Sequence, residues 1–110
     1  MKYLTRQEEL VLLSVFQLKK NAYLITIQNH LNRLTDKKWS ISSVYVPLSR
    51  LEKNGYLKST VGEATDKRGG KGIKYYQISK DGAKALADLK DVYDKMWKGT
   101  GELVIREQKG

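Results

Sequence analysis

The spacing of apolar residues changes twice along this chain of 110 residues, and the changes restrict its fold. Up to Gly55 the apolar residues recur every three or four positions, as on one face of a helix. From Tyr56 to Ile78 they alternate, and after Ser79 the helical spacing returns. Because helices and strands present one face with periods of 3.6 and 2 residues, we predict helices, then a strand pair, then a helix.

Three helices are predicted before Gly55. The first begins at Thr5, since Thr5 and Glu8 have the spacing of a capping box, and ends near Asn21. The second runs from residue 23 or 24 to 34, and the third follows Ser40, a favourable N-cap. Their apolar stripes are Leu24, Ile27, Leu31 and Leu34, and Ile41, Val44, Leu48 and Leu51.

Pro47 interrupts the third predicted helix. It lies seven residues after Ser40 and has no amide hydrogen to donate within the helix. We therefore expect a kink or a loosened first turn, with Gly55 as the left-handed cap at the end.

The second half of the chain predicts a hairpin and a long helix. Strands at residues 56–61 and 73–78 flank a basic loop over residues 62–72, and a helix runs from Ser79 to about Trp97. Residues 1–78 are expected to form one domain and residues 79–98 a separate C-terminal helix, with residues 99–110 unassigned.

Composition narrows the function. The 21 basic and 12 acidic side chains give a net charge of +9. The excess lies in the first 80 residues, with 7 − 3 = +4 in residues 1–39, 8 − 3 = +5 in residues 40–80 and 6 − 6 = 0 afterwards. The electrostatic field of such an excess of positive charge attracts polyanions, chiefly nucleic acid. No cysteine, one histidine and no long apolar run argue against a metal site, an enzyme, a cofactor or a membrane span, and favour a cytoplasmic protein.

The predicted fold is mainly α with a small β-hairpin, in the order of a winged helix-turn-helix followed by a long C-terminal helix. In that design the third helix enters the major groove of DNA, and the basic hairpin reaches phosphates or a minor groove.

The sequence resembles the PadR family of bacterial transcriptional regulators in several stretches. These are residues 43–57 (SVYVPLSRLEKNGYL), residues 62–65 and 68–71 of the loop, residues 74–78 with Gly82, and Ala22-Tyr23. The resemblance covers about residues 4–97 and implies a dimeric repressor whose last helix contacts its partner. Some relatives bind small aromatic or cationic compounds near that interface. The chain departs from the family at Leu24, where glycine is more frequent, and at Gly72 and Ile73, where basic residues are more frequent.

The candidate DNA contacts lie on the third helix, in the loop and before the third helix. They are Ser42, Ser43, Tyr45, Ser49 and Lys53, then Lys67, Arg68 and Lys71, then Lys37 and Lys38. Their alternatives are ordinary ones: the serines decorate or cap a helix, Tyr45 packs on the hairpin, and the lysines are solvated. Arg50 and Glu52 are either further contacts or an intramolecular pair.

The C-terminal helix is expected to form the dimer. Its apolar residues need a second surface, which another copy supplies; the alternative is that the helix folds back on its own domain. The predicted interface residues are Leu86, Leu89, Val92, Tyr93 and Met96. Tyr93 and Trp97 are candidate contacts for a small aromatic or cationic effector, or are simply interface packing.

These features together predict a sequence-specific DNA-binding regulator, a homodimeric repressor on a pseudo-palindromic operator, with a small-molecule effector as one means of control. The rival interpretation is a winged-helix adaptor that binds proteins and never meets DNA. The concentration of charge in residues 40–80 disfavours the adaptor.

Overall fold

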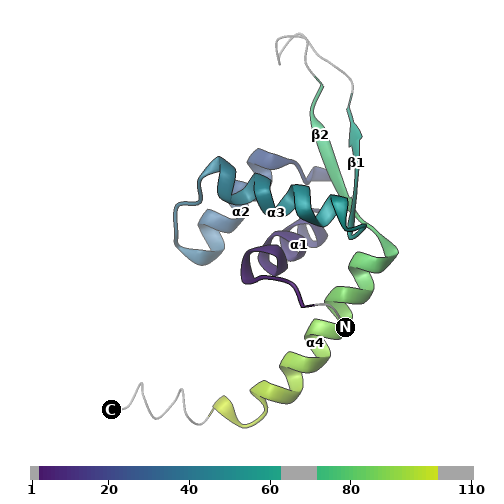
Figure 1. The fold of residues 1–110 in the computed structure, drawn as a ribbon. Helices are drawn as coiled ribbons and strands as arrows, with labels where there is room; N and C mark the ends of the chain where they lie inside the picture. The colour runs from purple at the N-terminus through teal and green to yellow at the C-terminus, as the bar shows by residue number, and fades with distance from the viewer. Residues whose placement is uncertain (1–2, 63–71, 102–110) are drawn as a thin grey trace.

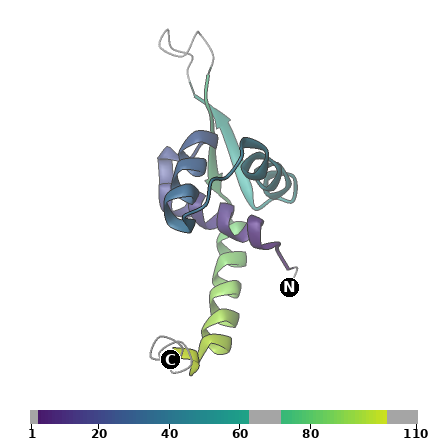
Figure 2. The ribbon, with the colours of Figure 1, turned by 90° about the vertical axis from the view of Figure 1, so that its left-hand side faces the viewer.

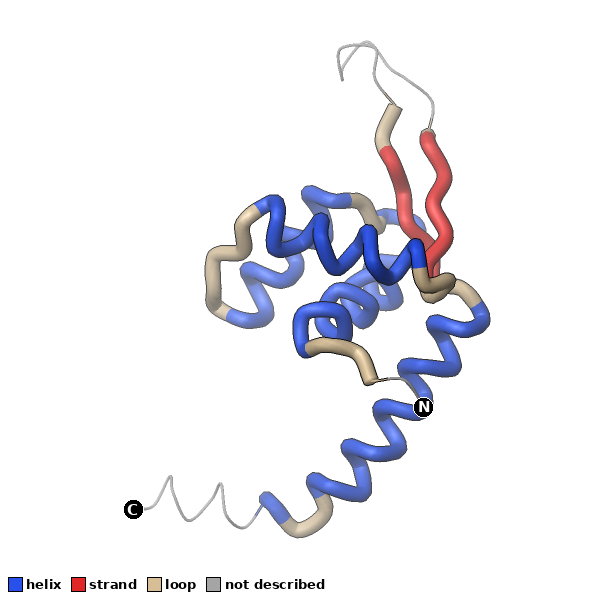
Figure 3. The backbone as a smooth tube through the Cα atoms, viewed as in Figure 1, coloured by secondary structure: helices blue, strands red, loops and turns tan. Residues whose placement is uncertain are grey.

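The computed structural model describes residues 3–62 and 72–101. Three helices pack together, a hairpin projects from them, and a fourth helix runs away from them (Figures 1 and 3). The elements are α1 (Arg6–Leu18), η1 (Lys19–Asn21), α2 (Leu24–Thr35), α3 (Ile41–Lys53), β1 (Leu57–Val61), β2 (Lys74–Ile78) and α4 (Lys80–Trp97). The predicted fold class and element order are confirmed.

Local hydrogen bonds explain where the helices begin. The Thr5 hydroxyl accepts from the Glu8 amide at 3.1 Å, and the Glu8 carboxylate accepts from the Thr5 amide at 2.7 Å, which completes the predicted capping box. Ser40 accepts from the Ser43 amide at 3.1 Å and Ser79 from the Gly82 amide at 3.0 Å. Each cap satisfies an amide that the helix itself leaves unpaired.

The prediction of a loosened first turn in α3 is wrong. The helix continues from Ile41 to Lys53 through Pro47, and Ser40 caps its first turn. Pro47 is buried, so packing of its ring offsets the amide bond that it removes. The helix ends at Asn54, and Gly55 has a φ of 84°, as the predicted left-handed cap requires.

The core lies between the first three helices and the base of the hairpin. Its buried apolar side chains are Val11, Leu12, Val15, Ala22, Ile27, Leu31, Val44, Leu48, Leu51, Leu57 and Tyr76. The predicted stripes are wrong at one end each: Leu34 is 61% exposed and Ile41 is 45% exposed. Both lie next to the turn between α2 and α3, where the helices end and fewer side chains surround them.

The hairpin is antiparallel and is anchored along its second strand. Leu57 pairs with Ile78, and Ser59 pairs with Tyr76. The Tyr76 amide also donates to the Ala22 carbonyl at 2.8 Å, so β2 lies between β1 and the segment after η1. The rings of Tyr23 and Tyr75 meet edge to face at 5.4 Å. This segment therefore supports the hairpin at its outer edge.

Helix α4 starts against the hairpin and then leaves the domain (Figures 1 and 2). A Cβ atom at Gly82 would lie 2.2 Å from the Tyr56 carbonyl oxygen, so only glycine permits this close start. Leu89 is buried, at 7% exposure, whereas Met96 and Trp97 at the far end are 71% and 64% exposed. Helix α4 thus packs on its own chain from its start to Leu89 and beyond, and only its far end is left uncovered.

Candidate nucleic-acid interface

The orientation of α3 is fixed by its buried face. Val44, Pro47, Leu48 and Leu51 are buried against the core, so the opposite face points to solvent. That exposed face carries Ser42, Tyr45, Val46, Ser49, Arg50 and Lys53. A helix with hydroxyl, phenol, guanidinium and ammonium groups on one open face can offer hydrogen bonds to base edges and phosphates.

Ser43 differs from the other predicted contacts on α3. Its amide donates to the Ser40 hydroxyl, and its own hydroxyl donates to the Ser40 carbonyl at 2.7 Å. Both polar groups are therefore used within the N-terminal cap, as the alternative interpretation of the serines supposed. Ser42 and Ser49 remain on the open face.

Val46 was not among the predicted contacts, and for Arg50 a contact was one of two alternatives; the structure places both on the open face. Val46 is 44% exposed, four residues after Ser42 and three before Ser49. The helical spacing could have revealed it, but an apolar residue carries no hydrogen-bonding signal. Arg50 is exposed and forms no salt bridge with any residue in the described part of the chain.

Glu52 joins α3 to the hairpin. Lys74 of β2 donates from its Nζ to the carboxylate at 2.9 Å, and the Ser59 hydroxyl of β1 donates to the other carboxylate oxygen. These hydrogen bonds, that of Ser59 first, hold the pKa of Glu52 below its usual value. Glu52 therefore forms the intramolecular contact, with Lys74 rather than Arg50, and fixes the hairpin relative to α3.

Lys37 and Lys38 lie on a turn that is held in place from both sides. Both are exposed just before α3. The Trp39 amide donates to the Asn32 side chain at 2.7 Å, and the Gln28 side chain donates to the Trp39 carbonyl at 2.7 Å. The two ammonium groups are thus attached to an ordered turn beside the N-terminus of α3. The other predicted cations, Lys67, Arg68 and Lys71, lie outside the described residues.

A second surface lies between α1 and α4. It is an apolar groove of about 440 Å³ whose lining includes Leu13, Phe16, Leu86, Leu89 and Tyr93. Leu13 and Phe16 are 42% and 57% exposed, so α1 keeps apolar surface that its own domain does not cover. We name this surface the α1–α4 groove.

Tyr93 ties α4 to α1 across this groove. Its hydroxyl donates to the Glu9 carboxylate at 2.6 Å, and this hydrogen bond is the main cause of the raised pKa of Tyr93. Of the predicted interface residues, the structure brings Leu86, Leu89 and Tyr93 to the groove. Trp97 is not part of the groove lining, so the two predicted effector contacts do not share one pocket.

The described residues give no support to other kinds of site. Residues 3–62 and 72–101 contain no group of three acidic or histidine side chains that could hold a metal ion. Within the same ranges no helix is both long and apolar enough to cross a membrane.

The comparisons with known proteins agree with this geometry. A family model described as "Transcriptional regulator PadR-like family" matches residues 12–88. A transcriptional regulator from Clostridium thermocellum is 25% identical, with 89% of each chain covered and a TM-score of 0.69. A PadR-like regulator from Bacillus cereus is 23% identical, with 88% of this chain and 89% of the other covered and a TM-score of 0.71. No curated protein matches the chain.

Proposed function

Because the chain belongs to the PadR-like family of transcriptional regulators, we propose that it is a homodimeric repressor that places α3 in the major groove of a pseudo-palindromic operator. The family consists of DNA-binding regulators rather than enzymes, so a role as a DNA-binding regulator follows from membership of the family. The dimer, the repression and any effector are the parts that experiments must test.

The open face of α3 is the observation that carries the proposal. An α-helix fits the major groove, which is about 12 Å wide and presents a distinct hydrogen-bonding pattern for each base pair. Ser42, Ser49 and Lys53 face solvent there, and Glu52 keeps the hairpin beside them. Because the net charge is +9, with the excess in residues 1–80, phosphate contacts would supply much of the affinity.

The α1–α4 groove supports the homodimer. Apolar side chains are exposed on α1, at Leu13 and Phe16, and at the uncovered end of α4, at Met96 and Trp97. Large exposed apolar patches mark interaction sites in soluble proteins. A second copy related by a two-fold axis would cover this surface and set two α3 helices about 34 Å apart, one turn of DNA.

The same groove gives the effector its most favourable place. Tyr93 lines it, and a small aromatic or cationic molecule beside Tyr93 would change how α4 crosses α1 and the partner. Such a molecule relieves repression only if it binds one dimer geometry more tightly than the other.

DNA binding is tested by fluorescence anisotropy with a duplex from upstream of the protein's own gene and a scrambled duplex, each at two salt concentrations. We expect tight, salt-sensitive binding that favours the native duplex. Equal binding to both duplexes would mean that the operator lies elsewhere. Absence of binding to both at low salt would refute the regulator and favour the protein-binding adaptor.

A further inference from the structure

A second groove lies on the hairpin, away from the DNA-binding face. Its volume is about 510 Å³, within the range of small-molecule sites. Ser59 and Lys74 contact Glu52 of α3, so their neighbours Lys58 and Tyr75 lie on the opposite face of the two-stranded sheet. Lys58 and Tyr75 line this groove, which we name the η1–hairpin groove.

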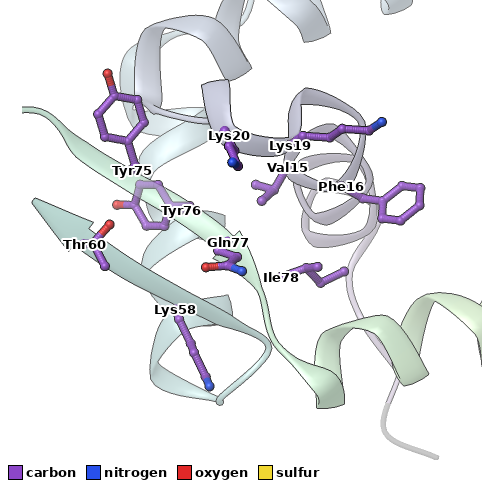
Figure 4. Close-up of a pocket in the computed structure, with 10 residues that line it drawn as sticks. All are labelled: Val15, Phe16, Lys19, Lys20, Lys58, Thr60, Tyr75, Tyr76, Gln77 and Ile78. Carbon is purple, nitrogen blue, oxygen red and sulfur yellow. The ribbon is translucent and has the colours of Figure 1, made fainter. Parts of the chain in front are cut away.

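The groove combines positive charge with apolar surface. Its lining includes Lys19 and Lys20 from η1 and Lys58 from β1, and the described residues add no carboxylate to it. Ile78 adds apolar surface, and the Tyr75 ring adds an aromatic face. Figure 4 shows Lys19 and Lys20 on the η1 side and Lys58 on the β1 side, with Ile78 between them in this view.

The two walls of the groove are held at a fixed distance by backbone contacts. The Tyr76 amide donates to the Ala22 carbonyl at 2.8 Å, which attaches the segment after η1 to β2. Lys19 has a φ of 53° and a ψ of −121°, a conformation that residues with side chains seldom adopt. This turn reverses the chain directly after α1 and places two consecutive lysines at the groove. A preformed site loses less entropy on binding than a flexible one.

We propose that the η1–hairpin groove binds a small organic anion that carries a flat apolar ring system next to its charged group. The lysines select a negative charge, because no carboxylate among the described lining residues competes for them. Tyr75 and Ile78 select the apolar body, because their exposed surface leaves water when the ligand binds. An inorganic anion would use only half of this site, and a neutral aromatic compound only the other half.

The test uses the full chain and two fluorescent probes that differ in one group. The first is 1-anilinonaphthalene-8-sulfonate, and the second is N-phenyl-1-naphthylamine, which has the same ring system without the sulfonate. The double variant Lys20→Gln/Lys58→Gln removes two charges from the groove. The matched control, Lys84→Gln/Lys98→Gln, removes two charges from exposed lysines that line neither groove.

We expect the sulfonate probe to bind at least ten times more tightly than the neutral probe. The Lys20→Gln/Lys58→Gln substitutions should lower the affinity for the sulfonate probe at least tenfold and leave the affinity for the neutral probe unchanged. The control substitutions should change neither affinity. All four lysines are exposed, so each variant should fold, which circular dichroism checks.

Three results would overturn the proposal: equal affinity for the two probes, equal weakening by both double variants, or no effect of Lys20→Gln/Lys58→Gln. The last result would mean that the probe binds at another surface. None of these measurements involves DNA, so the proposal stands or falls independently of the proposed regulator.

Discussion

Val46 provides a test of how α3 would read DNA. The thymine methyl group is the only apolar group that a base presents in the major groove, and Val46 is an apolar side chain at the centre of the open face of α3. If α3 enters the groove, Val46 should contact a thymine methyl in each half of the operator. Replacing Val46 by alanine, or that thymine by uracil, should remove the same contact.

The expected size of the effect follows from the exposure of Val46. Full burial of a valine side chain contributes about 1.5 kcal/mol, and 44% of the Val46 surface is still available to bury. The product is about 0.7 kcal/mol for each half-site, and about 1.3 kcal/mol for a dimer on two half-sites. Val46→Ala should therefore weaken operator binding by up to about tenfold.

The assay begins with selection of an operator from a random duplex library by the wild-type protein. Anisotropy titrations then compare the selected duplex with copies in which each thymine in turn is replaced by uracil. At one thymine of each half-site, replacement by uracil should lower the affinity of the wild-type protein for the duplex. The same replacement should not lower the affinity of the Val46→Ala variant further. Ser49→Ala serves as the control, because it leaves the methyl contact in place and should stay sensitive to uracil.

A contact between Val46 and a thymine methyl group would be refuted if uracil lowered the duplex affinity of the wild type and of Val46→Ala equally at every position. Failure of the selection to enrich any duplex would instead count against the proposed DNA-binding function. The two failures are therefore distinguishable.

Four further variants test the packing. Leu48→Ala should lower the free energy of unfolding by about 2–5 kcal/mol, because Leu48 is fully buried. Leu34→Ala should change the free energy of unfolding by less than about 0.5 kcal/mol, because Leu34 is 61% exposed. Thermal unfolding of both variants compares the two effects. Phe16→Glu should give a folded monomer in sedimentation, and an intact dimer would place the interface elsewhere. Glu52→Gln should lower the free energy of unfolding by less than about 1 kcal/mol, since the contact of Glu52 with Lys74 is partly exposed. Because the folded-state pKa of Glu52 is lowered from 4.5, its contribution is present above that pH and is lost as the pH falls through the folded pKa; denaturant titrations of both proteins should converge in acid.

Much of the fold follows from short-range features of the sequence. Thr5 with Glu8, Ser40 and Ser79 mark the helix starts because each cap joins residues only three apart. The change of period at Gly55 marks the hairpin because alternation reports a half-buried strand within a few residues. The exposed face of α3 follows in the same way from the positions of Val44, Leu48 and Leu51.

The contacts that shape the candidate sites join residues far apart in the chain, and local spacing carries no information about them. Glu52 pairs with Lys74, 22 residues later, and Tyr93 donates to Glu9, 84 residues earlier. Phe16 belongs to a strongly apolar helix, yet it is exposed because no other element of its own domain covers it. The sequence by itself determined the elements and their order, because these depend on neighbouring residues. Only the tertiary structure decided which surfaces of α1 and α4 remain open and which lysines share a groove, because these depend on how the elements pack.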